Sequence, residues 1–203
     1  AYNTLIDSQP WYGSPPVYEY DPDGARALLE EAGCMPCKVK IGISTSGSGQ
    51  MQPLPMNELV KEQLDAAGFE VELIPMDWNA LIGVFLAGSD KSEFDGINFS
   101  MAPIDASQGI LKKWMTAYAP PSCCNWGIYS NPEVDELGLA ALAEFDEAKR
   151  NEILTKMNDV VMADAPELFI VHDLNPRALS PKLSGFVQAQ SWFHDLTPIV
   201  VNP

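Results

Sequence analysis

Positive charge and long apolar runs are scarce in this sequence of 203 residues. It has 12 Lys and Arg against 28 Asp and Glu, so the formal net charge at pH 7 is -16. A field of this sign repels phosphate backbones and anionic lipid headgroups, which makes nucleic acid and membrane surfaces poor partners. No apolar run approaches the roughly 20 residues that a transmembrane helix needs. Because acidity also simply keeps proteins soluble, the charge by itself indicates no function.

Motifs that carry catalytic chemistry are also missing. The sequence has no Gly-x-Ser-x-Gly nucleophile elbow, no Gly-x-x-x-x-Gly-Lys phosphate loop and no His-Glu-x-x-His zinc motif. Residues 44–50 are rich in Gly and Ser after a predicted strand, but they lack the Lys of a phosphate loop. We interpret this stretch as a hinge or a cleft-edge loop. The expected protein is therefore not an enzyme and needs no cofactor.

Residues 38–76 predict a strand, a helix and a second strand, around which the rest of the chain is organised. Val39, Ile41 and Ile43 alternate with polar or small residues, and the pattern returns from Val71 onward. Between the two strands, apolar residues recur at helical spacing and end at Gly68. Two strands joined by a crossover of this length run parallel. The predicted fold class is α/β, with a mainly parallel sheet flanked by helices.

Capping residues and composition predict the remaining elements. Four further helix starts are indicated by Asp21, Asp77, Asn131 and Asp146. A third strand is expected at residues 94–101, a helix around Trp114 and a short buried strand at residues 168–171. Residues 119–129 are irregular and predict no element. The Pro- and Tyr-rich opening predicts a loop with no element to protect its aromatic side chains, and its first ten residues lack the features of a secretory signal.

Four cysteines raise the question of metal or redox chemistry. They are Cys34, Cys37, Cys123 and Cys124. The first two have the spacing of metal ligands, but adjacent cysteines rarely direct both sulfurs to one metal. A thioredoxin-like centre is disfavoured because the first pair ends a helix, where no helix dipole lowers a thiol pKa. We interpret all four as structural disulfides of an oxidising compartment and expect no metal site. The connectivity stays open, with metal binding, redox catalysis and free thiols as alternatives.

Three tracts resemble one known family. They are residues 20–33 (YDPDGARALLEEAG), 59–77 (LVKEQLDAAGFEVELIPMD) and 129–150 (YSNPEVDELGLAALAEFDEAKR), the last followed by a helix ending at 164–166 (DAP). In this order they are similar to the extracytoplasmic solute-binding proteins of ABC importers, in the oligopeptide, dipeptide and nickel class known as family 5. The resemblance covers most of residues 20–185.

The resemblance implies a receptor that traps its ligand between two lobes. This sequence would be the C-terminal lobe, of the periplasmic-binding-protein type II kind, with residues 1–20 near the hinge and residues 21–186 forming the lobe. Residues 187–203 would be a tail that returns to an N-terminal lobe absent here. The implied partners are a peptide or other small polar solute, that N-terminal lobe and the transmembrane permease subunits. The implied location is periplasmic or otherwise extracytoplasmic, with membrane association through the transporter.

The resemblance also indicates where a ligand would bind. In peptide-binding members, the loop after the strand equivalent to residues 94–101 carries a Trp and an Asp that pairs with the peptide amino terminus. Here that acidic position falls on Pro103 or Ile104, so the amine clamp is not where it is expected. Ser100, Met101 and Asp105 are the ligand candidates of this loop, although Asp105 could equally cap the next helix.

Two further residues could line a binding cleft. A cleft needs an apolar wall and a few polar groups that fix orientation, and Asn125 and Trp126 offer one of each in the irregular segment. Trp126 could instead be a core anchor. Trp11 and Trp192 are candidate contacts with the other lobe. The alternative function is a metal-binding or redox protein built on the four cysteines, which free-thiol counting and zinc analysis would distinguish from a solute receptor.

Overall fold

The predicted strand–helix–strand unit is confirmed in the computed structural model, which describes residues 1–47, 50–101, 105–172, 176–189 and 194–203. β1 (Cys37–Ser44) and β2 (Phe69–Met76) are parallel and in register over their whole length. α2 (Pro53–Ala67) joins them and begins, as predicted, at a proline. It ends at Gly68, whose φ of 111° is a conformation that glycine adopts without steric cost.

The third strand of the sheet is much shorter than the sequence pattern predicts. β3 (Gly96–Ile97) lies on the other side of β1, in the order β2-β1-β3, and pairs only with Ile41 and Gly42. At one end the carboxylate of Asp95 accepts a hydrogen bond from Lys40 N at 2.8 Å. At the other end Phe99 lies against other aromatic rings. The predicted extent of residues 94–101 was therefore wrong, because the backbone bonds from Asp95 N to Lys40 O and from Asn98 N to Gly42 O, both 2.9 Å, bound a pairing of only two residues.

Two further helices accompany the sheet, and both begin at the predicted caps. Asp21 accepts a hydrogen bond from Gly24 N at the start of α1 (Pro22–Glu31), and Asp77 accepts one from Asn79 N at the start of α3 (Trp78–Ala87). A 3-10 turn, η1 (Ser89–Lys91), follows α3. The buried apolar residues of this half are Ile43, Val71 and Leu81.

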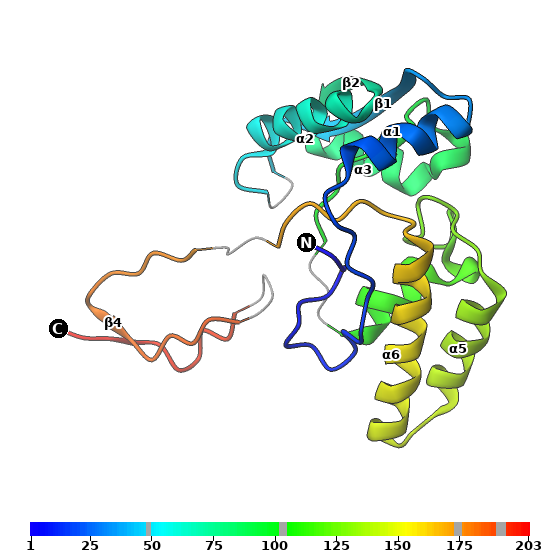
Figure 1. Cartoon of the computed structure of the whole chain (residues 1–203). Coiled ribbons are helices and arrows are strands. Elements are labelled where there is room, and N and C mark those ends of the chain that lie inside the picture. Colours follow the sequence, from blue (N-terminus) through cyan, green and yellow to red (C-terminus); the bar gives the residue numbers. More distant parts are fainter. Residues whose placement is uncertain (48–49, 102–104, 173–175, 190–193) are drawn as a thin grey trace.

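A helical half carries the main hydrophobic core. α5 (Pro132–Ala143) and α6 (Glu147–Asp164) lie side by side as an antiparallel hairpin, with η2 (Ser107–Leu111), α4 (Lys112–Trp114) and η3 (Thr116–Tyr118) packed nearby (Figure 1). Asn131 and Asp146 cap α5 and α6 as predicted. The core comprises Leu5, Ile110, Leu111, Trp114, Met115, Val134, Ala141, Leu154, Met157, Val161 and Met162.

The opening segment is partly buried in this core, which corrects the expectation of an unprotected loop for Trp11 but not for Tyr18 and Tyr20, which are 59% and 86% exposed. Leu5 is fully buried, and Trp11 packs against the core cluster. The indole N–H of Trp11 donates to Asn151 Oδ1 at 2.7 Å, and Ser14 N donates to Asp159 Oδ1 at 2.7 Å. Polar side chains spaced along α6 thus hold the backbone and side chains of residues 10–14. α6 covers this part of the opening segment, and no local sequence pattern predicts that contact.

The chain after α6 is largely extended. Residues 168–171, predicted as a buried strand, form no strand, and Leu168 and Val171 are 62% and 54% exposed. No described strand lies beside them to pair with. β4 (Leu183–Ser184) and β5 (Val200–Val201) form a short antiparallel pair in a tail that projects from the rest of the chain (Figure 1). No helix in the described part of the chain has the length and apolar character to cross a membrane.

Candidate functional site

The three parallel strands end at one edge of the sheet, and the segments that leave this edge form the candidate site. We call residues 44–47, 50–52, 76–79 and 97–101 the strand-end rim. Open α/β sheets hold their ligands at this carboxyl edge. Within the rim, the N–H of Thr45 donates to Met76 O at 3.0 Å, which ties the chain leaving β1 to the end of β2.

Amide and hydroxyl groups occupy the centre of the strand-end rim. The Gln50 amide donates from Nε2 to Asn98 Oδ1, and Asn98 N donates to Gly42 O at 2.9 Å. Ser44, the last residue of β1, is fully buried, and its Oγ has no hydrogen-bond partner in the described part of the chain. A buried hydroxyl without a partner costs about 1–3 kcal/mol. The rim therefore combines a coupled amide pair with an unsatisfied hydroxyl.

Aromatic rings form the apolar part of the rim. The ring centroid of Phe99 lies 4.8 Å from that of Trp78 and 4.4 Å from that of Phe85, with the Phe85 pair stacked. Gly47 has a φ of +79°, and a Cβ placed there would lie 3.4 Å from the Cβ of Trp78. The loop after β1 thus passes close to the indole. One wall of the rim is aromatic and half-buried, as a ligand pocket requires.

The predicted loop residues divide between two places. Ser100 and Met101 directly follow Phe99, are half-buried and belong to the strand-end rim. Pro103 and Ile104 lie outside the described residues, as does Trp192. Asp105 is exposed and lines a different groove of about 400 Å³ with Trp11 and Arg150, none of whose lining residues belongs to the rim. Its backbone carbonyl accepts from Gly109 N at 2.9 Å, which starts the η2 turn.

The amide of Asn125 is fully engaged inside its own loop. The side chain is 2% exposed, its Nδ2 donates to Met115 O at 3.3 Å and Tyr129 O at 2.7 Å, and its Oδ1 accepts from Tyr129 N at 2.9 Å. These bonds use both the donor and acceptor groups of the amide. The structure therefore gives Asn125 the role of ordering residues 115–129.

Trp126 joins the two halves of the chain. Its indole N–H donates to Val84 O at 3.2 Å, and its carbonyl accepts from Ser89 N at 2.9 Å. Val84 lies towards the C-terminal end of α3, whereas Trp78, in the strand-end rim, is the first residue of that helix. Asn125 and Trp126 thus lie at the opposite end of α3 from Trp78. The structure does not bring the two groups of predicted ligand residues together.

Both cysteine pairs are disulfide-bonded. Cys34 is joined to Cys37, and Cys123 to the adjacent Cys124. The first bond links the turn after α1 to the first residue of β1. Within the described ranges, no three His, Cys, Asp or Glu side chains lie together in a way that could hold a metal ion.

Tyr129 and Asp164, a hydrogen-bonded pair whose pKa values are shifted in opposite directions, lie outside the rim. Tyr129 Oη donates to Asp164 Oδ2 at 2.5 Å, and Asn131 Nδ2 donates to the same oxygen at 2.8 Å. Burial and the Asp164 contact raise the pKa of Tyr129, and the hydrogen bonds from Tyr129 and Asn131 lower the pKa of Asp164. These side chains tie the start of α5 to the end of α6, so the cluster stabilises the fold.

Sequence reasoning missed the rim residues Trp78, Gln50, Asn98 and Phe99. A signal existed for Gln50 and Trp78, which follow predicted strands at the edge where parallel strands hold ligands, whereas Asn98 and Phe99 lay inside the predicted strand 94–101. Trp78 and Phe99 instead matched the apolar periodicity of a helix and a strand. The rim offers hydroxyls, amides and aromatic rings, which is the chemistry of non-covalent recognition.

A comparison with protein families shows which family the chain belongs to. The family described as "Bacterial extracellular solute-binding proteins, family 5 Middle" matches residues 1–116, more than half of the sequence. The chain belongs to this family. Family 5 members are solute-binding components of ABC importers, and they are transport receptors rather than enzymes, as the sequence predicted.

Individual family 5 proteins show how much of a member the chain represents. The glutathione-binding protein GsiB of Pectobacterium atrosepticum is 28% identical over 184 residues, which cover 83% of this chain and 33% of that protein. The chain therefore spans about a third of the length of the curated relatives it matches.

Solved structures of family 5 proteins share the fold. DppA from Helicobacter pylori, in complex with the peptide STSA, has a TM-score of 0.76 at 16% identity, over 99% of this chain and 38% of that one. The murein tripeptide-binding protein MppA of Escherichia coli has a TM-score of 0.73 at 21% identity, over 92% and 36%. At these identities the likeness concerns the fold, and it agrees with the predicted α/β class.

Proposed function

We propose that this chain is the C-terminal lobe of a longer extracytoplasmic receptor that delivers a small polar solute to an ABC permease. The observation that carries the proposal is the strand-end rim, where Trp78 and Phe99 form an aromatic wall beside the Gln50–Asn98 amide pair. Pockets for small molecules combine such a wall with a few orienting polar groups. The named relatives bind glutathione and peptides, and others bind nickel complexes. The solute is held between the rim and a second lobe.

The segments outside the lobe support this division. In the tail, Val187, Leu196, Val200 and Val201 are 56–72% exposed, which is costly for apolar side chains without a covering surface. We assign residues 187–203 to contact with the N-terminal lobe, and residues 1–20 to the vicinity of the hinge. Closure of the lobes around the solute then presents the loaded receptor to the permease.

Among the earlier ligand candidates, Ser100 and Met101 keep this role in the proposal because they lie in the strand-end rim. Asp105, Asn125 and Trp126 are assigned to the η2 turn, to the 115–129 loop and to the joint between the two halves. All four cysteines are engaged in disulfides, which disfavours the metal or redox alternative.

The test compares the full-length receptor with the isolated chain. Native mass spectrometry of the full-length protein as purified from its source should detect a bound solute below about 1 kDa, since a solute of this size matches a lobe-enclosed pocket. Calorimetric titration of that solute should show binding to the full-length receptor and at least 100-fold weaker binding to the isolated chain. Equal affinity for both would overturn the division between two lobes, and absence of any solute would overturn the receptor role.

A further inference from the structure

In the α/β half, residues 21–101, the two edges of the parallel sheet differ in the charge of their side chains. Residues 21–101 contain five Lys and Arg: Arg26, Lys38, Lys40, Lys61 and Lys91. The strand-end rim contains no Lys, Arg or His, and its one ionised side chain is the carboxylate of Asp77. The rim instead carries the amides Gln50, Gln52, Asn79 and Asn98 and the hydroxyls Ser44, Thr45, Ser46 and Ser100.

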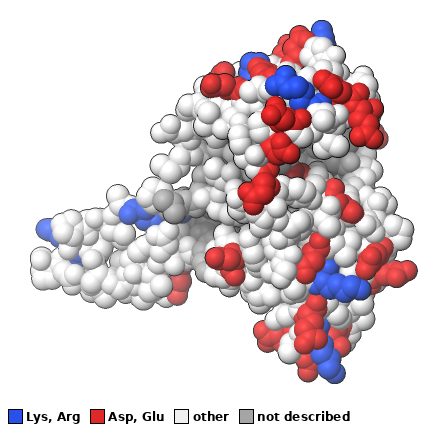
Figure 2. Space-filling model, viewed as in Figure 1, with Lys and Arg blue, Asp and Glu red and all other residues white. Residues whose placement is uncertain are grey.

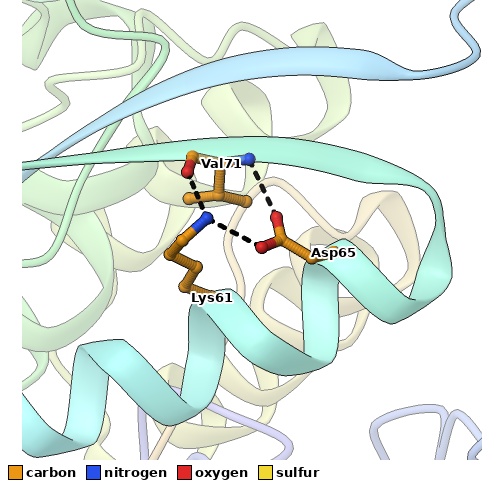
Figure 3. Close-up of polar contacts among 3 residues, drawn as sticks. All are labelled: Lys61, Asp65 and Val71. Carbon is orange, nitrogen blue, oxygen red and sulfur yellow. Dashed lines mark hydrogen bonds and ion pairs between the residues drawn. The ribbon is translucent and has the colours of Figure 1, made fainter.

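The five cations lie towards the amino edge of the sheet and several are held there by structural contacts. Lys61 Nζ lies 2.7 Å from Asp65 Oδ2 and 2.6 Å from the carbonyl of Val71, while the other Asp65 oxygen accepts from Val71 N at 2.9 Å (Figure 3). This closed triangle clamps the last turns of α2 to the first residues of β2. Lys61 therefore serves the fold and is not directed to the rim.

Other cations repeat this pattern. Arg26 donates to the carbonyl of Ala66 in the last turn of α2, and Lys40 Nζ lies 4.0 Å from the carboxylate of Glu93, before β3. Figure 2 shows charged side chains gathered over the right of the upper half, with mostly uncharged atoms at its left end, where α2 begins in Figure 1. An anionic group at the strand-end rim would meet no cation from this half and would face a net charge of -16.

Neutral hydrogen-bonding groups beside aromatic rings suit an uncharged, hydroxyl-rich ligand. An amide donates from its nitrogen and accepts at its oxygen, so it can pair with two neighbouring hydroxyls. Among the described residues none accepts a hydrogen bond from Asn98 Nδ2, which leaves that donor for a ligand. The apolar C–H face of a sugar ring matches the flat, half-buried surface of Trp78.

On these grounds, and resting on the proposed receptor function, we propose that the strand-end rim selects a neutral oligosaccharide rather than a peptide with charged termini. Asn98 orients the sugar hydroxyls and Trp78 supports a ring face. Discrimination arises because a carboxylate desolvated at this rim would lose its hydration without gaining a cationic partner.

The experiment uses the full-length receptor, freed of carried-over solute by unfolding and refolding. The probes for calorimetry are neutral tri- and tetrasaccharides of the β-1,4-glucose, β-1,4-mannose and α-1,4-glucose series, glutathione, trialanine with free termini and N-acetyl-trialanine amide. We expect micromolar or tighter binding of at least one saccharide and at least 100-fold weaker binding of all three peptides.

Variants connect the affinity to the rim. Asn98→Ala should weaken saccharide binding about 10-fold, as expected for loss of the hydrogen bonds of one orienting amide. Gln63→Ala removes an exposed amide from α2, outside the rim, and should leave the affinity unchanged. Thermal melting of both variants establishes that each is folded before titration.

The outcomes separate the substrate class from the receptor function. Tightest binding of glutathione, of free trialanine or of the capped peptide overturns the saccharide assignment and leaves the receptor intact. Saccharide binding that Asn98→Ala does not change overturns the role of the rim. If no probe binds and the protein as purified carries no solute, both the saccharide assignment and the receptor function fail.

Discussion

Removing the charge of Glu167 should destabilise the chain more than removing that of its buried partner, Lys113. The Lys113 side chain is only 10% exposed, and its Nζ lies 2.5 Å from Glu167 Oε2 and 3.3 Å from Thr4 Oγ1. The same nitrogen lies 4.8 Å from the Trp114 ring centroid and 5.7 Å from that of Phe169. The ion pair thus links α4 to the opening segment and to the chain after α6.

The structure indicates the size and order of the effects. Glu167→Gln leaves a buried ammonium without its counter-charge, a change that costs about 3–5 kcal/mol in a fully buried pair. Because the Glu167 side chain is 37% exposed, we expect about 2 kcal/mol here, or a Tm lowered by about 4–8 °C. Lys113→Met replaces the ammonium with an apolar chain of similar length between aromatic rings, at a cost below about 1 kcal/mol.

Urea unfolding followed by circular dichroism measures these free energies. The double variant should resemble Lys113→Met, since the charge that Glu167 compensates is then gone. The exposed pair of Lys156 and Glu133, 3.3 Å apart, is the matched control, and Glu133→Gln should cost less than about 1 kcal/mol. A smaller loss for Glu167→Gln than for Lys113→Met would refute the reasoning from burial.

Three further predictions concern pH, disulfides and the rim. The pKa of Asp164 is lower in the folded chain than in the unfolded one, so its contribution to stability is present above the unfolded pKa and is lost as pH falls through the folded pKa; unfolding measured from pH 6 to pH 2 should show a shallower decline for Asp164→Asn. Replacing Cys34 and Cys37 with Ser opens a four-residue loop and should lower the free energy of unfolding by about 2 kcal/mol, measured in urea against the oxidised parent. Ser44→Ala removes a buried hydroxyl that has no hydrogen-bond partner among the described residues and should raise that free energy by up to about 1 kcal/mol, and a loss of more than this would show that the hydroxyl is satisfied in solution.

Helix starts could be predicted from sequence because caps are local. Asp21, Asp77, Asn131 and Asp146 each accept a backbone N–H within the next few residues, so no knowledge of the tertiary fold is needed. The parallel pairing of β1 and β2 followed from the length of the crossover alone. These parts of the fold depend on short-range geometry.

Burial was harder to predict because it depends on neighbours that sequence periodicity does not reveal. In α2 the pattern assigned Leu59 to the apolar face, yet Leu59 is 55% exposed, while Asn57 is 2% exposed and donates to Pro53 O at 2.7 Å. Residues 168–171 are apolar without forming a strand. Periodicity thus predicted the helix but not the surface that covers each face.

The candidate site was only partly predictable for a related reason. Asn125 and Trp126 were predicted as ligand contacts because they are a polar and an aromatic residue in an irregular segment, a pattern that also suits an internal anchor. Their hydrogen bonds to Tyr129 and Val84 give them an anchoring role, and their contact with a ligand stays a prediction. Ser100 and Met101 were predicted through family resemblance, which marks the end of a strand. Residues far apart in sequence, such as Gln50 and Asn98, become one site only when the strand order is known.

A parallel sheet separates the residues that hold the fold from those available for recognition. All amino ends meet at one edge, where Lys61 and Asp65 fasten the end of α2 to the start of β2 and Arg26 fastens α1 to the end of α2. All carboxyl ends meet at the other edge, where Asn98 and Trp78 lie. Because Lys61 and Arg26 make their contacts at the first edge, their substitution should change stability without changing ligand affinity, whereas substitution of Asn98 at the strand-end rim should change ligand affinity with little effect on stability. The specificity of such a lobe can therefore diverge while its charged framework stays the same.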